Sequence, residues 1–405
     1  MDIFWQLKKV GYRVQQTLFR ILMQFLKYPE QTLLTHPGDM EKIPDILKDK
    51  GLDSVFIACS KTVLSSGALD ALLSGLKSSA INYTIFDRIQ PNATTDNASE
   101  GVKAYRENSC KAIIAIGGGS VLDCAKIIGL SVSNPSLTYE DMKRMSAIKK
   151  RMPLFIAVPT TAGTGSESSL GAVITNIHTK EKYAVISLHN MCDYVILDET
   201  LTLSLPSPIT AYTGMDALTH AVEAYISKYA TEYTNSEALK AIKLIFENLP
   251  AAVENGNNTD ARRNMLLASN YAANAFTRAY TGYVHTISHA FGALYNSNHG
   301  KTNAAILPLM LRYYGKSIEK KLAEIAVYTD LAKQGESKAY LAEKLIQHIE
   351  SLNLAFGITP TIPELKQTDI PLIAKKALAE GNPAYPVPKI MNFSECCGII
   401  EKLVS

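Results

Sequence analysis

The feature that most constrains the fold of this 405-residue chain is a change of sequence texture near residue 205. Before it, short β-branched apolar runs alternate with helical periods such as those over 65–78 and 97–108. We expect strands at 54–59, 83–86, 112–116 and 153–159, with further strands near 171–176, 183–187 and 194–198. Strands joined by helices favour a parallel sheet covered on both faces, the doubly wound arrangement.

After Leu205-Pro-Ser-Pro208 the sequence contains helical periods and turns, with almost no strand signal. The sequence therefore predicts an amphipathic leader helix over 1–28, an α/β nucleotide-binding domain over 29–205 and an all-helical domain over 206–405. A cleft between two such domains is the usual place for a small-molecule site.

Composition narrows the class of protein. Hydrophobic residues make up 47% and charged residues 20%, which excludes a disordered, collagen-like or disulfide-stapled chain. The 41 basic residues against 38 acidic ones form no basic block, so the charge gives no indication of nucleic-acid binding. Six irregularly spaced cysteines fit a reducing compartment, and we expect a cytoplasmic protein.

The first 28 residues form a leader segment whose apolar pattern has several interpretations. Apolar residues recur there at helical spacing between Lys and Arg residues, while Asp2 and the interrupted stripe argue against a signal peptide. No apolar run reaches the roughly 18 residues of a membrane span. We favour an amphipathic helix packed on its own protein or on a twin subunit. A basic helix lying on a membrane surface is the alternative.

Two loops follow predicted core strands. Gly117-Gly-Gly-Ser120 leads into a helix whose first N–H groups and positive dipole end suit a phosphate. Ser120 and Asp123 have the spacing of a capping box that would fix the helix start. Taken alone, the segment could equally be a plain glycine turn, since G-x-G-x-x-G is absent.

The second loop, Pro159-Thr-Thr-Ala-Gly-Thr-Gly-Ser-Glu167, alternates hydroxyl and small side chains. Both loops follow the carboxyl ends of strands, where open α/β sheets bind nucleotides. Together they predict a dinucleotide site.

Histidines in the second half of the chain are grouped. Asp216 and His220 are four residues apart in a helical pattern, as are His285 and His289, and His299 follows in a polar turn. A lone histidine on such a helix is usually structural. Several histidines and one carboxylate on shared helix faces instead favour a divalent ion such as Fe²⁺ or Zn²⁺.

Four ordered motifs resemble the iron-containing (group III) alcohol dehydrogenase family. They are 117–126, 159–167, 214–223 and His285-x3-His289-x9-His299-Gly300, and the resemblance runs from about residue 30 to the C-terminus. The leader lies outside it. The resemblance implies a dehydroquinate-synthase-like fold, with an α/β nucleotide-binding domain and a helical metal domain.

The resemblance also implies roles for individual residues. The metal ligands it implies are Asp216, His220, His285 and His299. The histidine near the nicotinamide would be His289, which we take as the catalytic residue. Cofactor contacts would come from Asn92, Gly118, Gly119, Ser120, Asp123, Thr160, Thr161, Thr164, Ser166 and Lys182.

One position departs from the family pattern. Members that favour NAD typically carry an Asp after the first strand, where this chain has Ser60 followed by Lys61. An acidic side chain would repel a 2′-phosphate and Ser60 does not, so we favour NADP over NAD.

These observations lead to a metal-dependent dehydrogenase that transfers hydride between a nicotinamide cofactor and a primary alcohol or aldehyde. The alternatives are a metal-dependent lyase of the dehydroquinate synthase type and a non-catalytic nucleotide-binding protein. A homodimer is expected on general frequency. We expect the substrate pocket near Tyr225, Phe276 and Tyr295.

Overall fold

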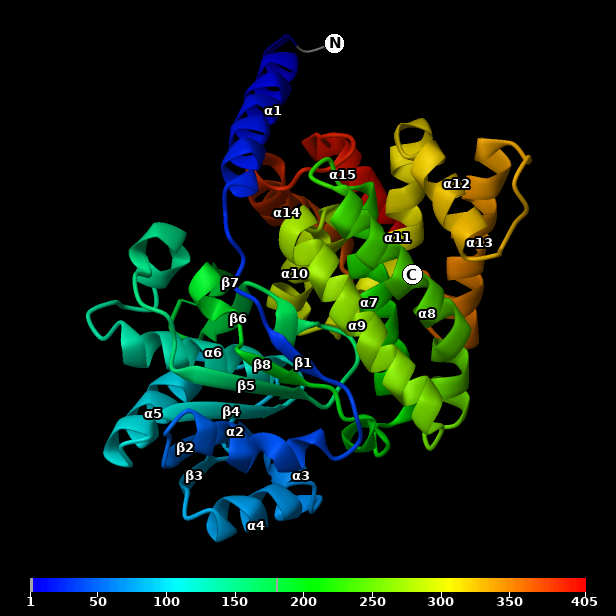
Figure 1. Cartoon of the computed structure of the whole chain (residues 1–405). Helices are drawn as coiled ribbons and strands as arrows, with labels where there is room; N and C mark the ends of the chain where they lie inside the picture. The colour runs from blue at the N-terminus through cyan, green and yellow to red at the C-terminus, as the bar shows by residue number, and fades with distance from the viewer. Residues whose placement is uncertain (1–2, 180) are drawn as a thin grey trace. The chain divides into compact units, whose positions relative to one another are not determined.

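The computed structural model describes residues 3–179 and 181–405, and the chain divides into two compact units (Figure 1). The α/β unit comprises Tyr28–Leu205 and Gly256–Asn270. The helical unit comprises Met1–Lys27, Pro206–Asn255 and Tyr271–Ser405. The division thus falls at the change of texture after Leu205. It also groups the leader with the helical unit and a short later segment with the α/β unit.

The α/β unit is built on a six-stranded sheet in which every pair is parallel, in the order β1-β8-β5-β4-β2-β3. Its strands are β1 (Thr32–Leu34), β2 (Ser54–Cys59), β3 (Asn82–Phe86), β4 (Ala112–Gly117), β5 (Leu154–Pro159) and β8 (Tyr194–Ile196). A separate antiparallel pair is formed by β6 (Gly171–Asn176) and β7 (Glu181–Ile186). The predicted strands are confirmed, and β1 is an addition that its three residues made too short to detect.

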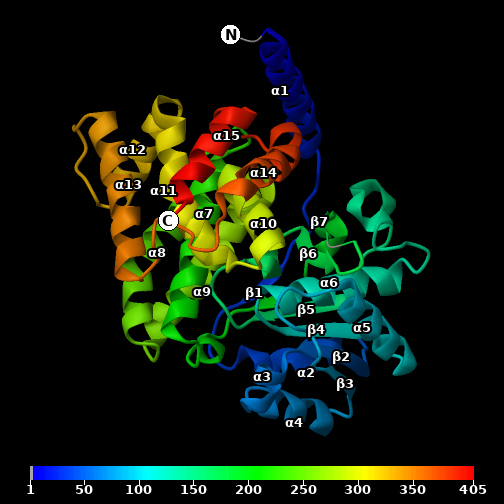
Figure 2. The ribbon, with the colours of Figure 1, turned by 180° about the vertical axis from the view of Figure 1, so that it is seen from behind.

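Helices cover both faces of the six-stranded sheet, as expected from its continuous apolar strands (Figures 1 and 2). They are α2 (Ile43–Asp49), α3 (Lys61–Ser65), α4 (Asp70–Ser78), α5 (Thr95–Glu107) and α6 (Gly119–Ser133). On one face Val55 and Ile57 of β2 share a buried cluster with Leu47 and Leu72. On the other, the ring of Phe56 lies 5.8 Å from that of Tyr105 in α5.

The predicted helix over 65–78 is partly wrong. The structure has two helices there, α3 ending at Ser65 and α4 beginning at Asp70. Between them Gly67 adopts a φ of +77°, which ends the first helix because a left-handed residue cannot continue it.

Nine helices follow the leader in the described part of the chain after residue 206, and they belong to the helical unit except for the first half of α9, which is grouped with the α/β unit. They are α7 (Ser207–Ile226), α8 (Glu232–Glu254), α9 (Thr259–Ala279), α10 (Tyr283–Tyr295), α11 (His299–Tyr314), α12 (Glu319–Tyr328), α13 (Lys338–Ala355), α14 (Ile370–Ala384) and α15 (Phe393–Ile400). Every residue of α7 from Gly214 to Ile226 is buried. This helix is therefore the centre of the unit, packed against α8 and α11.

The leader forms α1 (Ile3–Gln24), as predicted, and it packs on its own protein. It docks on the helical unit through Arg13, Gln16, Phe19 and Met23. Other apolar residues of the helix are exposed on this chain, and they are Ile3, Phe4, Leu7, Val10, Val14, Leu18 and Ile21. In the part of the chain that the structure describes, no helix is long and apolar enough to cross a membrane.

Helix α11 approaches α7 unusually closely at Gly300. A Cβ atom built there would lie 2.2 Å from the carbonyl oxygen of Tyr212 and 3.3 Å from Cβ of Asp216. Backbone cannot move aside as a flexible side chain can, so glycine is required for these two helices to meet.

We expect Gly300→Ala to destabilise the protein by about 1–3 kcal/mol, as overpacking a closed core does, and to lower its melting temperature by several degrees. Gly292→Ala in α10 is the matched control, because a Cβ there has no atom within 4 Å. Thermal unfolding followed by circular dichroism measures both. Equal melting temperatures for the two variants would contradict the close approach.

Candidate metal and cofactor sites

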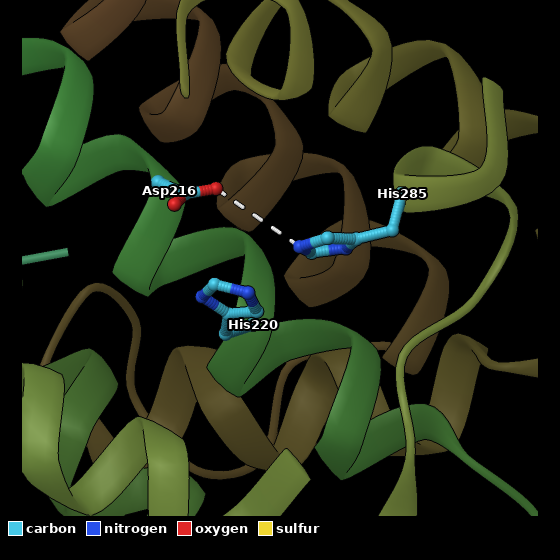
Figure 3. A group of neighbouring side chains, drawn as sticks. All are labelled: Asp216, His220 and His285. Atoms are coloured by element: carbon cyan, nitrogen blue, oxygen red, sulfur yellow. Dashed lines mark ion pairs between the residues drawn. The ribbon is translucent and has the colours of Figure 1, made fainter. Parts of the chain in front are cut away.

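Three buried side chains of the helical unit converge on one point (Figure 3). Asp216 and His220 lie one turn apart on α7, and His285 comes from α10. Ligand atoms of the three all lie within 4.8 Å of one another. The fourth predicted ligand, His299, is the first residue of α11, and its Nε2 is 3.6 Å from Oδ1 of Asp216. The structure thus brings all four residues together.

The amide of Asn303 shows how these acceptors are arranged. Its Nδ2 lies 2.7 Å from Oδ1 of Asp216, 3.3 Å from Nε2 of His285 and 3.1 Å from Nε2 of His299. Three lone pairs from three helices therefore point at one small region. Such convergence of a carboxylate and imidazoles is the donor arrangement that a divalent transition metal requires.

The electrostatics of the cluster also suit a cation. Burial lowers the pKa of His285 well below its ordinary value, so its imidazole is neutral and offers a lone pair. Burial acts to raise the pKa of Asp216, but His220, His299 and His285 together hold it below its ordinary value. The residues present therefore fit a bound metal, because they offer a carboxylate and imidazole nitrogens that lie close together.

Glu223 supports His285 from behind. Its Oε2 is 2.6 Å from Nδ1 of His285, and it also accepts hydrogen bonds of 2.9 Å from the N–H groups of Gly282 and Val284. Burial raises the pKa of Glu223 to about 7, although these N–H groups oppose the rise. A carboxylate on Nδ1 fixes the tautomer in which Nε2 faces the cluster.

Our sequence analysis missed Glu223, although a signal was present. Asp216, His220 and Glu223 follow at i, i+4 and i+7, so all three lie on one face of α7.

His289 lies beside the cluster and has a different partner. Its ring stacks on that of His299, with centroids 5.3 Å apart. Its Nδ1 is 2.9 Å from Oε1 of Glu380 in α14, and the hydroxyl of Tyr385 donates to the same oxygen at 2.8 Å. Burial acts to raise the pKa of Glu380, but His289 and Tyr385 hold it below its ordinary value. Glu380 is thus an ionised acceptor that orients His289.

The glycine loop of the α/β unit places several predicted cofactor residues together. Gly118 caps α6, and Oγ of Ser120 accepts a hydrogen bond from the N–H of Asn92 at 3.1 Å. Nζ of Lys182 donates to Oδ1 of Asn92 at 3.0 Å. The backbone N–H groups at the start of α6 therefore lie near a lysine, and this combination suits a pyrophosphate.

The predicted capping box of Ser120 and Asp123 is wrong. Helix α6 begins at Gly119, and its cap makes no side-chain hydrogen bond. Asp123 instead accepts from Oγ of Ser166 at 2.5 Å and from the N–H of Val173 at 3.0 Å. These partners lie more than 40 residues away in sequence, so local spacing could not indicate them.

The second loop meets the first because β4 and β5 end side by side, with Gly117 paired to Pro159. The N–H of Thr160 donates to the carbonyl of Gly117 at 3.0 Å. A Cβ on Gly119 would lie 2.7 Å from Cγ2 of Thr164, and one on Gly118 would lie 3.4 Å from Thr161. Glycine at 119 gives room for this contact, which brings the predicted threonines next to the glycine turn.

A buried lysine, which our sequence analysis quoted but did not interpret, fixes the end of the second loop. Lys126 of α6 is fully buried, and its Nζ donates to the carbonyls of Ser166, Ser169 and Gly171 at 2.5, 2.8 and 3.1 Å. One ammonium thus holds three carbonyl groups of the chain that follows the predicted cofactor threonines.

Ser60, the position of the expected cofactor selectivity, caps α3 by accepting from the N–H of Val63 at 3.3 Å. Its backbone bridges to Arg88, and both Arg88 and Lys61 are exposed. Two cations therefore flank this serine.

The expected substrate-pocket residues separate. The ring of Phe276 stacks on that of His220, with centroids 4.3 Å apart. The hydroxyl of Tyr225 donates to Glu324, and that of Tyr295 donates to Asp369. Of the three, Phe276 is therefore the one in contact with the metal cluster.

A doubly wound α/β unit and a buried Asp and His cluster together are typical of metal-dependent enzymes that use a nucleotide cofactor. Family models agree. The iron-containing alcohol dehydrogenase model matches residues 30–199, and the model of the C-terminal part of the Fe-containing alcohol dehydrogenase family matches residues 210–404. The chain belongs to the iron-containing alcohol dehydrogenase family.

Individual relatives cover most of the chain. It is 38% identical over 359 residues to a 1,3-propanediol dehydrogenase of Citrobacter freundii, covering 88% of this chain and 90% of the relative. It is 30% identical over 353 residues to the lactaldehyde reductase of Escherichia coli, covering 85% and 92%. A crystal structure of a 1,3-propanediol oxidoreductase superposes with a TM-score of 0.89 at 35% identity, covering 93% of this chain and 100% of that one.

The protein is therefore a metal-dependent alcohol dehydrogenase or aldehyde reductase, an oxidoreductase that uses iron and a nicotinamide cofactor. The family match leaves no role for the lyase or the non-catalytic alternative.

We expect Glu223→Gln to weaken metal binding by about 10–100-fold, because partners of this kind tune ligand basicity and orientation. The matched control is Glu237→Gln, which changes a buried carboxylate of α8 that pairs with Lys240. Metal content after dialysis against a chelator series measures the effect. Unchanged affinity in Glu223→Gln would show that Glu223 has a packing role alone.

Proposed function

We propose that Asp216, His220, His285 and His299 hold one Fe²⁺ and that the enzyme interconverts primary alcohols and aldehydes. The observation that carries this assignment is the meeting of three acceptor atoms at the amide of Asn303. The same ligands accept Zn²⁺, so metal supply decides between the two ions.

We further propose that the two loops of the α/β unit bind the dinucleotide. The start of α6 at Gly118 and Gly119, with Ser120, Asn92 and Lys182 beside it, would take the pyrophosphate. The second-loop hydroxyls of Thr160, Thr161, Thr164 and Ser166 would contact the rest of the cofactor. Asp123 supports that loop through Ser166.

When bound, iron supplies Lewis acidity toward the substrate oxygen, and the nicotinamide gives or takes the hydride. The chain itself supplies positioning. Helices α7, α10 and α11 carry the ligand side chains, and burial restricts the movement of Asp216, His220 and His285. Phe276 covers one face of His220 and excludes water from that side.

His289 is proposed to move the proton that accompanies hydride transfer. Because Glu380 accepts from Nδ1, the lone pair lies on Nε2, where a proton can be taken from the alcohol or returned to the aldehyde oxygen. Glu380 is a positioning residue in this scheme, and Tyr385 holds Glu380 in turn.

NADP is our proposed cofactor. The chain has Ser60 where a carboxylate would repel a 2′-phosphate, and Lys61 follows it in sequence. Arg88 pairs with Ser60 through its backbone, and its side chain lies 3.6 Å from Glu100. We propose a homodimer because dimers are the commonest oligomers. We propose the cytoplasm because the cysteines of the chain are free thiols, as is usual in a reducing compartment.

We expect iron-loaded enzyme to oxidise NADPH with short aldehydes, with kcat/KM for NADPH at least about tenfold above that for NADH. Absorbance at 340 nm with a panel of aldehydes, including 3-hydroxypropanal and lactaldehyde, measures this. His285→Ala should lose both metal and activity. A tenfold preference for NADH would reverse the cofactor assignment, and full metal content in His285→Ala would contradict the ligand set.

We expect Glu380→Gln to lower kcat by about 10–100-fold through loss of the orienting carboxylate, with KM and metal content unchanged. Glu380→Asp should recover part of the rate, because it restores a charged acceptor. Steady-state kinetics measures kcat and KM, and metal analysis measures the metal content of each variant. Wild-type kcat in Glu380→Gln would remove Glu380 from the mechanism, and lost metal would assign it to the metal site instead.

A further inference from the structure

An ordinary surface helix packs its apolar face on the protein and exposes its polar face. Helix α1 instead uses polar groups for much of its attachment. Gln16 is buried, and its Nε2 donates to the carbonyls of Tyr385 and Asn382 at 2.8 and 3.3 Å. The backbone carbonyl of Gln16 accepts from the hydroxyl of Tyr229, and Arg13 donates to the carbonyl of Pro388 at 3.1 Å. In both views α1 lies beside α14 (Figures 1 and 2). Polar groups thus make much of the attachment.

Most of the apolar stripe faces away from this attachment, and one edge of it, at Val10, Val14 and Leu18, borders the helical unit. Its members are between 49% and 77% exposed, and they are Ile3, Phe4, Leu7, Val10, Val14, Leu18 and Ile21. Phe25, just after the helix, is 78% exposed. A contiguous apolar stripe of this length on a surface marks an interaction site, because burying apolar surface away from water is favourable in free energy.

The charge of α1 indicates which partner would cover the apolar stripe. From residue 3 to residue 29 the chain has five cations and no Asp or Glu. A second copy of α1 packed on the first would bring cations against cations with no carboxylate to compensate them. An anionic lipid surface is complementary in both respects, since it takes the apolar stripe and attracts the Lys and Arg residues.

The shape of the stripe agrees. Ile3, Leu7, Val10 and Val14 keep the spacing of a two-helix seam, but the next seam position is Thr17. The apolar surface instead widens to Phe4 and Leu18. A stripe broader than a coiled-coil seam is typical of a helix that lies flat in a bilayer interface.

The flank of the stripe adds a site for headgroups. Val10, Val14 and Leu18 line a groove of about 780 Å³ whose other wall contains Ile390. The groove also carries Lys9, Arg13 and Lys389, with one carboxylate, Glu395, that Lys389 contacts at 3.2 Å. Cations beside an apolar wall suit a lipid phosphate and the start of its acyl chain.

We propose that residues 3–25 bind the surface of an anionic lipid bilayer, with the apolar stripe in the interface and the helical unit attached through the opposite side of α1. This binding is peripheral, and it is independent of the catalytic assignment.

The full-length enzyme should sediment with vesicles of phosphatidylcholine containing about one third phosphatidylglycerol, about tenfold more than with phosphatidylcholine alone. Leu7→Glu/Leu18→Glu should reduce this binding by about tenfold or more, since it places charge in the apolar interface. Lys8→Gln/Lys9→Gln/Arg20→Gln, which leaves the stripe intact, should reduce it in the same direction, as should added salt.

Leu354→Glu in α13 is the matched control, because Leu354 is 82% exposed outside the stripe. It should sediment like the wild type. Circular dichroism and light scattering on every variant report folding and assembly. Equal sedimentation of wild type and the Leu7→Glu/Leu18→Glu variant overturns the proposal. So does a result in which that variant dissociates an oligomer while the wild type binds no vesicles, which would assign the stripe to a second copy.

Discussion

The helical unit is organised around Asp216, a buried carboxylate that lies close to several histidine rings. Burial acts against the ionised form of Asp216, whereas the neighbouring histidines and the amide of Asn303 stabilise that form. The helices that carry these residues must therefore pack closely. Helix α7 is buried along most of its length so that Asp216 and His220 can project inward, and α11 must come close enough at Gly300 to add His299.

The supporting residues extend this arrangement outward. Glu223 contacts Nδ1 of His285, and Glu380 contacts Nδ1 of His289, so each carboxylate orients its histidine. The two histidines differ in burial. His285 is enclosed, which fits its proposed role as a metal ligand, whereas His289 is part-exposed, which fits its proposed role in proton transfer.

The sequence allowed the sheet to be predicted, because its strands are visible as local apolar runs. The set of Asp216, His220, His285 and His299 came instead from the family resemblance, because local periodicity cannot bring residues of α7, α10 and α11 together. The sequence did not allow β1, which has three residues, or the break at Gly67, which depends on a positive φ. The capping box of Ser120 and Asp123 was wrong because these side chains bond to distant partners, Asn92 and Ser166. Glu380 was missed since 91 residues separate it from His289.

Lys126 has a consequence for how a cofactor meets the α/β unit. By anchoring three carbonyls from within the protein, it orders the end of the second loop during folding. A ligand that binds such a loop does not have to order it, so little conformational entropy of the loop is lost on association. The price of that rigidity is a buried ammonium that stays stable only while every one of its carbonyl partners is in place.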